Sequence, residues 1–201
     1  MKKILYGFIG LFLVIGIVAG TAYALFTSQA TVTGMVLGTS TPGLKVSFMN
    51  KTNATPTGYY SSIDFLGWGH TFAPLLPGEE DWGAFFLKND STGTTDPLHF
   101  KLKGSITAAQ GDWNILKDVI QMKICVFDQT QDNSCNTGHQ TNYMTLSEWN
   151  TTGGDLPGTD LLQGTERAYV VVFYIHPSHG NSISGKTITD MTMQVIGTQV
   201  E

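Results

Sequence analysis

The sequence predicts an all-β protein, a jelly-roll-like β-sandwich preceded by an N-terminal signal helix. Beyond the first segment, apolar residues recur with a period of two over runs of strand length. Turns that contain Gly, Pro, Asn or Asp separate these runs, while stretches with helical periodicity are short and few. Thr and Gly are abundant and only 13% of residues are charged. This composition suits pleated strands that are joined by tight turns.

Residues 1–24 have the three regions of a secretory signal peptide. Met1-Lys2-Lys3 is a short basic start, an apolar run follows, and Ala22-Tyr23-Ala24 is a small-x-small ending. As a helix of roughly 30 Å the run would also span a bilayer, so a retained anchor is the alternative. The small-x-small ending and the polar stretch after it favour cleavage between Ala24 and Leu25. We therefore expect a secreted, extracellular or cell-surface protein that contacts the membrane only before cleavage.

Residues 25–38 form a separate N-terminal strand in this interpretation. One face of its period-two pattern carries mostly small side chains, and Thr and Gln occupy the other face. Such a strand can pair within its own sheet as the first strand of the sandwich, or it can add to the exposed edge of a neighbouring molecule. The residues expected on the shared face are Phe26, Ala30, Val32, Gly34 and Val36.

Residues 39–201 are expected to form the sandwich domain. The apolar run 169–175 predicts a central strand that is covered on both faces. Only 108–118 and 145–149 are candidate helices, and Thr145 followed by Glu148 fits a capping box. The remaining strands are predicted from alternating apolar residues over 81–88, 98–103, 121–126 and 186–197.

The chain contains two cysteines, Cys125 and Cys135, which a polar loop separates. In an exported protein we expect them to form a disulfide. The alternation of the surrounding strand places Cys125 on the side that faces away from the core. Closing a loop of this size contributes about 2–3 kcal/mol in the chain-entropy model.

Charge and motifs exclude several classes of function. The net charge is −5 and Arg167 is the only arginine, so the basic face that nucleic-acid binding requires is missing. The sequence has no His-Glu-x-x-His zinc motif and no Gly-x-Ser-x-Gly nucleophile motif. His176 and His179 lie in a Pro-containing turn, which is typical of plain surface. No catalytic residue, metal ligand or cofactor is predicted.

Four Asn-x-Ser/Thr sequons are candidate glycosylation sites. They begin at Asn50, Asn53, Asn89 and Asn150.

Several short motifs follow one another in a fixed order along nearly the whole chain. Lys2-Lys3-Ile4-Leu5 and the apolar run lead to Ala22-Tyr23-Ala24-Leu25-Phe26-Thr27-Ser28. Gly43-Leu44-Lys45-Val46, Leu76-Pro77-Gly78-Glu79 and the strand 85–89 come next, and 181–186 with 193–199 close the chain. In this order they resemble the TasA/camelysin (CalY) family of exported proteins, which have SipW-dependent signal peptides. Thr27-Ser28 replaces the family's usual Asp, and the cysteine pair is not a family hallmark.

The resemblance implies a jelly-roll subunit that is exported through Sec and trimmed by a SipW-like signal peptidase. Such subunits assemble as homopolymers into extracellular fibres or pili of a biofilm matrix. The resemblance further implies donor-strand complementation, in which the N-terminal strand completes the sheet of the next identical subunit. Two alternatives remain: a secreted metalloendopeptidase, as camelysin relatives have been described, and a monomeric cell-surface adhesive β-domain.

Overall fold

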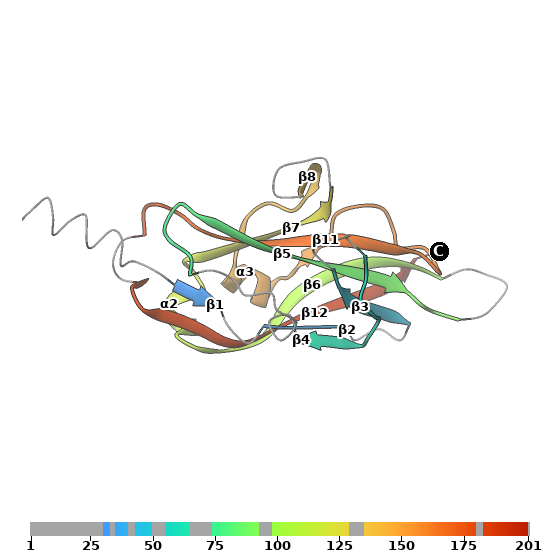
Figure 1. Cartoon of the computed structure of the whole chain (residues 1–201), viewed down its shortest axis with the longest axis horizontal. Coiled ribbons are helices and arrows are strands. Elements are labelled where there is room, and N and C mark those ends of the chain that lie inside the picture. Colours follow the sequence, from blue (N-terminus) through green and yellow to red (C-terminus); the bar gives the residue numbers. More distant parts are fainter. Residues whose placement is uncertain are drawn as a thin grey trace, which may run out of the picture.

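The computed structural model describes residues 30–32, 35–39, 43–49, 55–64, 74–92, 98–128, 135–179 and 183–200. These residues form two six-stranded sheets with few helices, which confirms the predicted all-β class (Figure 1). The expected signal segment, residues 1–24, and the cleavage position between Ala24 and Leu25 lie outside the described residues. Among the described residues, no helix is both long enough and apolar enough to cross a membrane.

The first sheet, sheet A, contains both the first and the last strands of the described chain. Its longest strand is the last one, which has β6 on one side and the N-terminal strands on the other. In spatial order the sheet contains β10 (Gly154–Asp155), β6 (His99–Gly111), β12 (Lys186–Val200), β2 (Val36–Thr39) and β4 (Ser62–Asp64), and β1 (Ala30–Val32) also pairs with β12.

The second sheet, sheet B, has β11 at its centre. Val170 and Val172, whose side chains face away from the sandwich core, are 0% and 1% exposed, so β11 is covered on both faces as predicted. The spatial order is β3 (Leu44–Phe48), β5 (Glu80–Asn89), β11 (Glu166–Ile175), β7 (Ile120–Phe127) and β8 (Cys135–Gln140), and β9 (Met144–Thr145) also pairs with β7.

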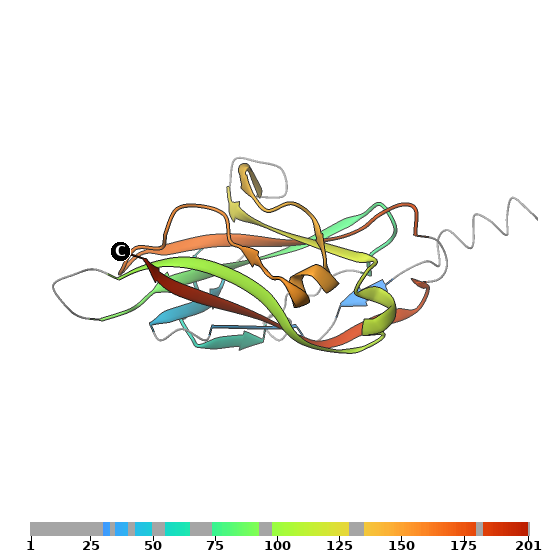
Figure 2. The same ribbon diagram turned by 180° about the vertical axis from the view of Figure 1, so that it is seen from behind.

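The two sheets share one hydrophobic core, to which every long strand contributes alternate side chains. Phe85 and Phe173 point inward from sheet B, and Met193 points inward from sheet A; all three are 0% exposed. Trp149 closes the core from the helix α3 (Leu146–Thr151), and its indole Nε1 donates to the carbonyl oxygen of Met122 at 2.8 Å. In Figure 2, which views the molecule from behind, α3 lies at the front.

One helix prediction is confirmed and one is wrong. The side chain of Thr145 accepts from the Glu148 amide, and the Glu148 carboxylate accepts from the Thr145 amide, which is the predicted capping box. The predicted helix 108–118 is reduced to α2 (Trp113–Leu116). Residues up to Gly111 remain in β6 because they pair with β12, and these tertiary hydrogen bonds override the local helical preference.

Candidate functional site

The N-terminal strand segment lies inside the protein's own sheet. β1 and β2 both run parallel to β12, with Ala30 beside Lys186 and Val36 beside Thr192. The register is the same in both strands, since the residue numbers of the partners differ by the same amount. β1 and β2 therefore act as one strand along β12. Thr33 and Gly34, which connect them, lie outside the described residues, as does Phe26.

The other side of this segment is also occupied. The Ala30 amide donates to the carbonyl oxygen of Leu75 at 3.0 Å, and the Leu75 amide donates back at 2.8 Å. Further along, β2 pairs with β4, with Leu37 beside Ile63. We call the place between β12 on one side and Leu75 and β4 on the other the strand slot. The segment fills this slot as an internal strand, which is the own-sheet alternative left open by the sequence.

Side-chain burial corrects the predicted face of this segment. Ala30 and Val32 are 0% and 1% exposed, as the period-two pattern requires. The next buried residues are Met35 and Leu37, both 0% exposed, whereas Val36 is half-buried. The inward face therefore shifts by one residue between Val32 and Met35. The prediction that Val36 shares the face of Ala30 and Val32 is wrong because a strict alternation does not continue through this point.

The neighbouring strands shift face in the same part of the sheet. On β12 the buried positions pass from Ile188 to Met191, again a step of three. Asp190 has φ of 51°, which is left-handed for a residue other than Gly, and the register between β12 and β6 shifts on either side of Thr192. This is a β-bulge, an irregularity that shifts the face of a strand and increases the local twist. The N-terminal segment keeps its register only because it makes the same shift.

The start of β12 is held by the residues that follow β6. The Asp112 amide donates to the Thr187 carbonyl oxygen at 2.8 Å, and the Thr187 amide donates to Asp112 Oδ2 at 3.0 Å. Lys186 Nζ lies 3.5 Å from Asp112 Oδ1. The Thr187 hydrogen bond and, after it, the Lys186 charge lower the pKa of the Asp112 carboxyl below its usual value. This contact fixes the end of β12 at which β1 pairs.

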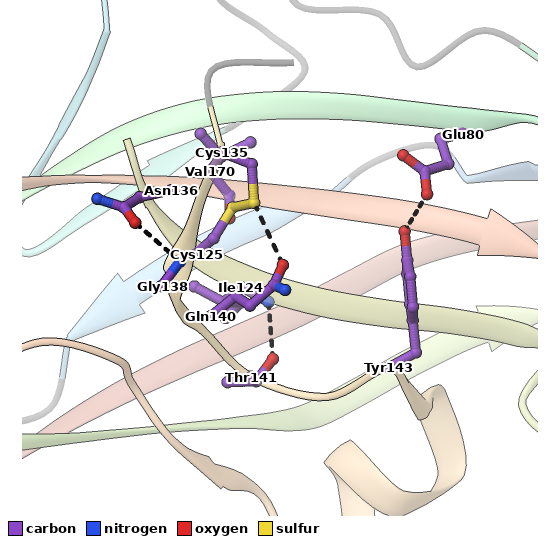
Figure 3. Close-up of a disulfide and its surroundings, with 10 residues drawn as sticks. All are labelled: Glu80, Ile124, Cys125, Cys135, Asn136, Gly138, Gln140, Thr141, Tyr143 and Val170. Atoms are coloured by element: carbon purple, nitrogen blue, oxygen red, sulfur yellow. Dashed lines mark hydrogen bonds between the residues drawn. A yellow bond between two sulfur atoms is a disulfide. The ribbon is translucent and has the colours of Figure 1, made fainter. Parts of the chain in front are cut away.

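The predicted disulfide is present on the outer face of sheet B (Figure 3). Cys125 on β7 and Cys135 at the start of β8 are joined, with Cα atoms 5.6 Å apart. Both pack with Val170 and Val172 in a second hydrophobic cluster, separate from the sandwich core. Cys125 thus faces away from the core, as the alternation predicted. The disulfide joins the start of β8 covalently to β7 at the edge of sheet B.

Two tyrosines on the outer face of sheet B each make the same pair of contacts, a hydrogen bond from the hydroxyl to a glutamate and a lysine ammonium near the ring. Tyr143 donates its hydroxyl to Glu80 Oε1 (Figure 3). Lys123 Nζ lies 4.6 Å from the centre of the Tyr143 ring. Burial raises the pKa of Tyr143, and the bond to Glu80 raises it further.

Tyr59 repeats the arrangement on the same face, beside the other end of β11. It donates to Glu166 Oε2, and Lys88 Nζ lies 5.2 Å from its ring centre. Sequence reasoning missed both arrangements, because their members are far apart in the chain.

The candidate glycosylation sites differ in their exposure to solvent. Asn89 is 0% exposed, and its Nδ2 donates to the carbonyl oxygens of Leu98 at 2.7 Å and Leu161 at 3.0 Å. A glycan on this nitrogen is incompatible with the folded domain, because the fold has no space for it. Asn150 is exposed on α3 and donates to the Ile106 carbonyl oxygen. Asn50 and Asn53 lie outside the described residues.

The turn histidines form a local surface contact. His176 Nδ1 lies 2.8 Å from Ser178 Oγ, and the Ser178 amide donates to the same nitrogen at 3.2 Å. His176 is exposed and His179 is half-buried. Within the part of the chain that the structure describes, no three His, Cys, Asp or Glu side chains come together as a group that could hold a metal ion.

Comparison of the chain with protein-family models, with curated proteins and with solved structures finds no match.

Proposed function

We propose that this chain is an exported structural subunit that assembles head-to-tail into extracellular fibres or pili of a biofilm matrix. The observation that carries the proposal is the internal place of β1 and β2 in sheet A, beginning a few residues after the expected signal segment. The resemblance of the sequence to the TasA/camelysin family agrees with this proposal. It also implies export through Sec and removal of residues 1–24 by a SipW-like signal peptidase.

Because the strand slot is filled by the chain's own strand, the proposed assembly is a strand exchange. A second copy supplies its residues 30–39 and forms the same backbone bonds and the same core packing with Ile188 and Leu75. The interactions formed between copies then equal those broken within each copy. The equilibrium between monomer and exchanged assembly therefore depends on the protein concentration and on the connecting segment. Each copy gives its strand to one neighbour and receives one from another. Such an interface does not close on itself and propagates as a filament.

The connection after the strand makes the proposed filament compact. β2 ends at Thr39 in sheet A and β3 begins at Leu44 in sheet B. The Thr39 hydroxyl donates to the Leu44 carbonyl oxygen at 2.7 Å across this corner. Fully extended, residues 40–43 would separate the two strands by at most about 18 Å. Exchanging subunits are therefore in direct contact.

A monomeric surface β-domain is the second candidate function, and the same strand favours it. Ala30, Val32, Met35 and Leu37 complete the core of their own molecule. A single copy therefore has no unfilled place in this part of sheet A and does not need a partner to fold.

A cysteine lock distinguishes strand exchange from both a monomer and another kind of assembly. Thr31 and Thr187 are register partners with half-buried side chains, and neighbouring strands lie at a spacing that a disulfide can bridge. In Thr31→Cys/Thr187→Cys protein of residues 25–201, oxidation of the monomer should hold the strand in its own slot. We expect negative-stain microscopy to show fibres from the wild type and from the reduced variant, and none from the locked variant.

The position of the new disulfide in assembled protein provides the second readout. Oxidation after assembly should link different chains, giving a ladder of covalent multimers on a non-reducing gel. Fibres from the locked monomer, or only intramolecular bonds in fibres, would show that assembly does not use this strand. If the wild type forms no fibres at any concentration, the monomeric candidate is supported. N-terminal sequencing of the secreted chain tests cleavage between Ala24 and Leu25.

A further inference from the structure

Two tyrosine rings are in contact on the outer face of sheet B. Tyr174 lies on β11 and Tyr143 lies just before β9, and their ring centroids are 5.3 Å apart with planes inclined by 40°. Both side chains are partly exposed, so small oxidants reach them from solvent. When two neighbouring tyrosines are each oxidised by one electron, their rings couple through the carbons beside the hydroxyl groups. The contact therefore brings together two groups that are able to form a covalent bond.

A proton acceptor for this oxidation is already in place. Tyr143 donates its hydroxyl to Glu80 Oε1 (Figure 3), and Glu80 is also the cross-strand partner of Tyr174. Loss of an electron makes a phenol strongly acidic, so a carboxylate that already accepts the hydrogen bond takes the proton without rearrangement. Two further charged or titratable groups contact the pair among the described residues: Lys123, over the Tyr143 ring, and His176, edge-on to Tyr174 at 6.4 Å.

We propose that Tyr143 and Tyr174 are a modification site, at which hydrogen peroxide acting through a haem peroxidase joins the two rings as an intramolecular dityrosine. Each phenol loses one electron and its hydroxyl proton; Glu80 accepts the proton from Tyr143, and the partly exposed Tyr174 releases its proton to water. The two radicals form one carbon–carbon bond, and the ring hydrogens at the coupled carbons then move to the oxygens, which restores both phenols. In total the protein loses two hydrogen atoms, and one peroxide is reduced to two water molecules.

The cross-link would fix a segment that the disulfide already holds at its other end. Residues 135–143 begin at Cys135, which is bonded to Cys125, and end at Tyr143 beside β11. With both bonds formed, β8 and the following turn are covalently attached to the face of sheet B at two points. The modification is independent of the proposed strand exchange, since the strand slot belongs to the other sheet.

The experiment treats folded protein of residues 25–201 with a haem peroxidase and limiting hydrogen peroxide. We expect dityrosine fluorescence in the monomer fraction and a mass lower by two hydrogen atoms. Trypsin cuts after Lys123, Arg167 and Lys186, so the expected product is a covalent link between the peptides 124–167 and 168–186. Tyr143→Phe and Tyr174→Phe should each abolish the linked peptide. Tyr60→Phe is the matched control and should leave it unchanged, although Tyr60 is 46% exposed.

Further variants separate the role of the pair from general tyrosine oxidation. Glu80→Gln should lower the initial rate of coupling while the same peptides remain linked, because Glu80 is a positioning residue and proton acceptor. The same treatment in denaturant should lose the selectivity for this pair. The proposal is overturned if the linked peptide persists in Tyr143→Phe, or if folded protein gives only intermolecular products. Far-UV circular dichroism confirms that each variant is folded.

Discussion

Val32 on β1 is the register partner of Ile188 on β12, and both strands change their inward face immediately after this pair. The next buried residue is Met35 on one strand and Met191 on the other, so each strand moves by three positions in place of two. A strand that alternated strictly would turn its apolar side chains to solvent beyond this point. The N-terminal segment and the bulge at Asp190 are therefore complementary features of one sheet.

The shifted face gives the first prediction. Leu37→Ala removes a side chain that is 0% exposed and should lower the free energy of unfolding by about 2–5 kcal/mol. Val36→Ala is the matched control on the adjacent, half-buried position and should cost about 1 kcal/mol or less. Urea denaturation followed by tryptophan fluorescence measures both. A larger loss of stability for Val36→Ala than for Leu37→Ala would show that Val36 lies on the inward face, as strict alternation predicts.

A pair of glycines gives the second prediction, because both have similar left-handed backbones in different surroundings. Gly164 has φ of 75° and a Cβ there would meet no atom within 4 Å, so Gly164→Ala should cost only the backbone term, about 1–2 kcal/mol. Gly111 has φ of 73°, and its Cβ would lie 2.4 Å from the Thr187 carbonyl oxygen. Gly111→Ala should therefore cost at least about twice as much, since the backbone of β12 must move.

Urea denaturation compares the two glycine variants, and hydrogen exchange then locates the effect. Faster amide exchange in Gly111→Ala should centre on the start of β12, where Thr187 and Lys186 contact Asp112. Equal losses of stability in Gly111→Ala and Gly164→Ala would show that the close approach to Thr187 is relieved without strain.

The disulfide gives the third prediction. Replacing Cys125 and Cys135 together by Ala keeps the buried cluster apolar and removes the covalent link with its two sulfur atoms. The free energy of unfolding should fall by about 2–3 kcal/mol in the chain-entropy model for a loop with a sequence separation of 10. Chemical denaturation of the variant, beside reduced wild-type protein, measures this loss. An unchanged denaturation midpoint would show that the loop is already ordered in the unfolded chain.

Local patterns predicted the long strands β5, β7, β11 and β12, the disulfide and the Thr145 capping box because each depends on residues that are near in sequence. The short strands β4, β8, β9 and β10 were not predicted. The end of β6 and the face of Val36 were predicted wrongly because both depend on pairing with β12 at the far end of the chain. The contact of Tyr143 with Glu80 spans 63 positions and leaves no periodic signal in the sequence. Apolar periodicity thus identifies strands, but their register and the contacts across a face come from the tertiary fold.

Asp112 gives the last prediction, a dependence of stability on pH. The Thr187 amide and Lys186 lower the pKa of its carboxyl in the folded state. A carboxyl with a lowered folded pKa contributes stability that is fully present above its unfolded pKa and is lost as the pH falls through the folded pKa. The urea concentration at the midpoint of unfolding of wild-type protein should therefore decrease as the pH is lowered from about 5 to about 2.

In Asp112→Asn this contribution to the acid-induced loss should be missing, and the protein should be less stable than wild type at neutral pH. Asp155→Asn is the control, since it breaks the exposed ion pair with Lys101 and should change stability little. If both variants follow the same pH profile as wild type, the Asp112 contact does not hold the start of β12. A selective effect of Asp112→Asn would instead show that acid loosens β12 at the end where Ala30 pairs with Lys186, and acid should then also speed hydrogen exchange in β1.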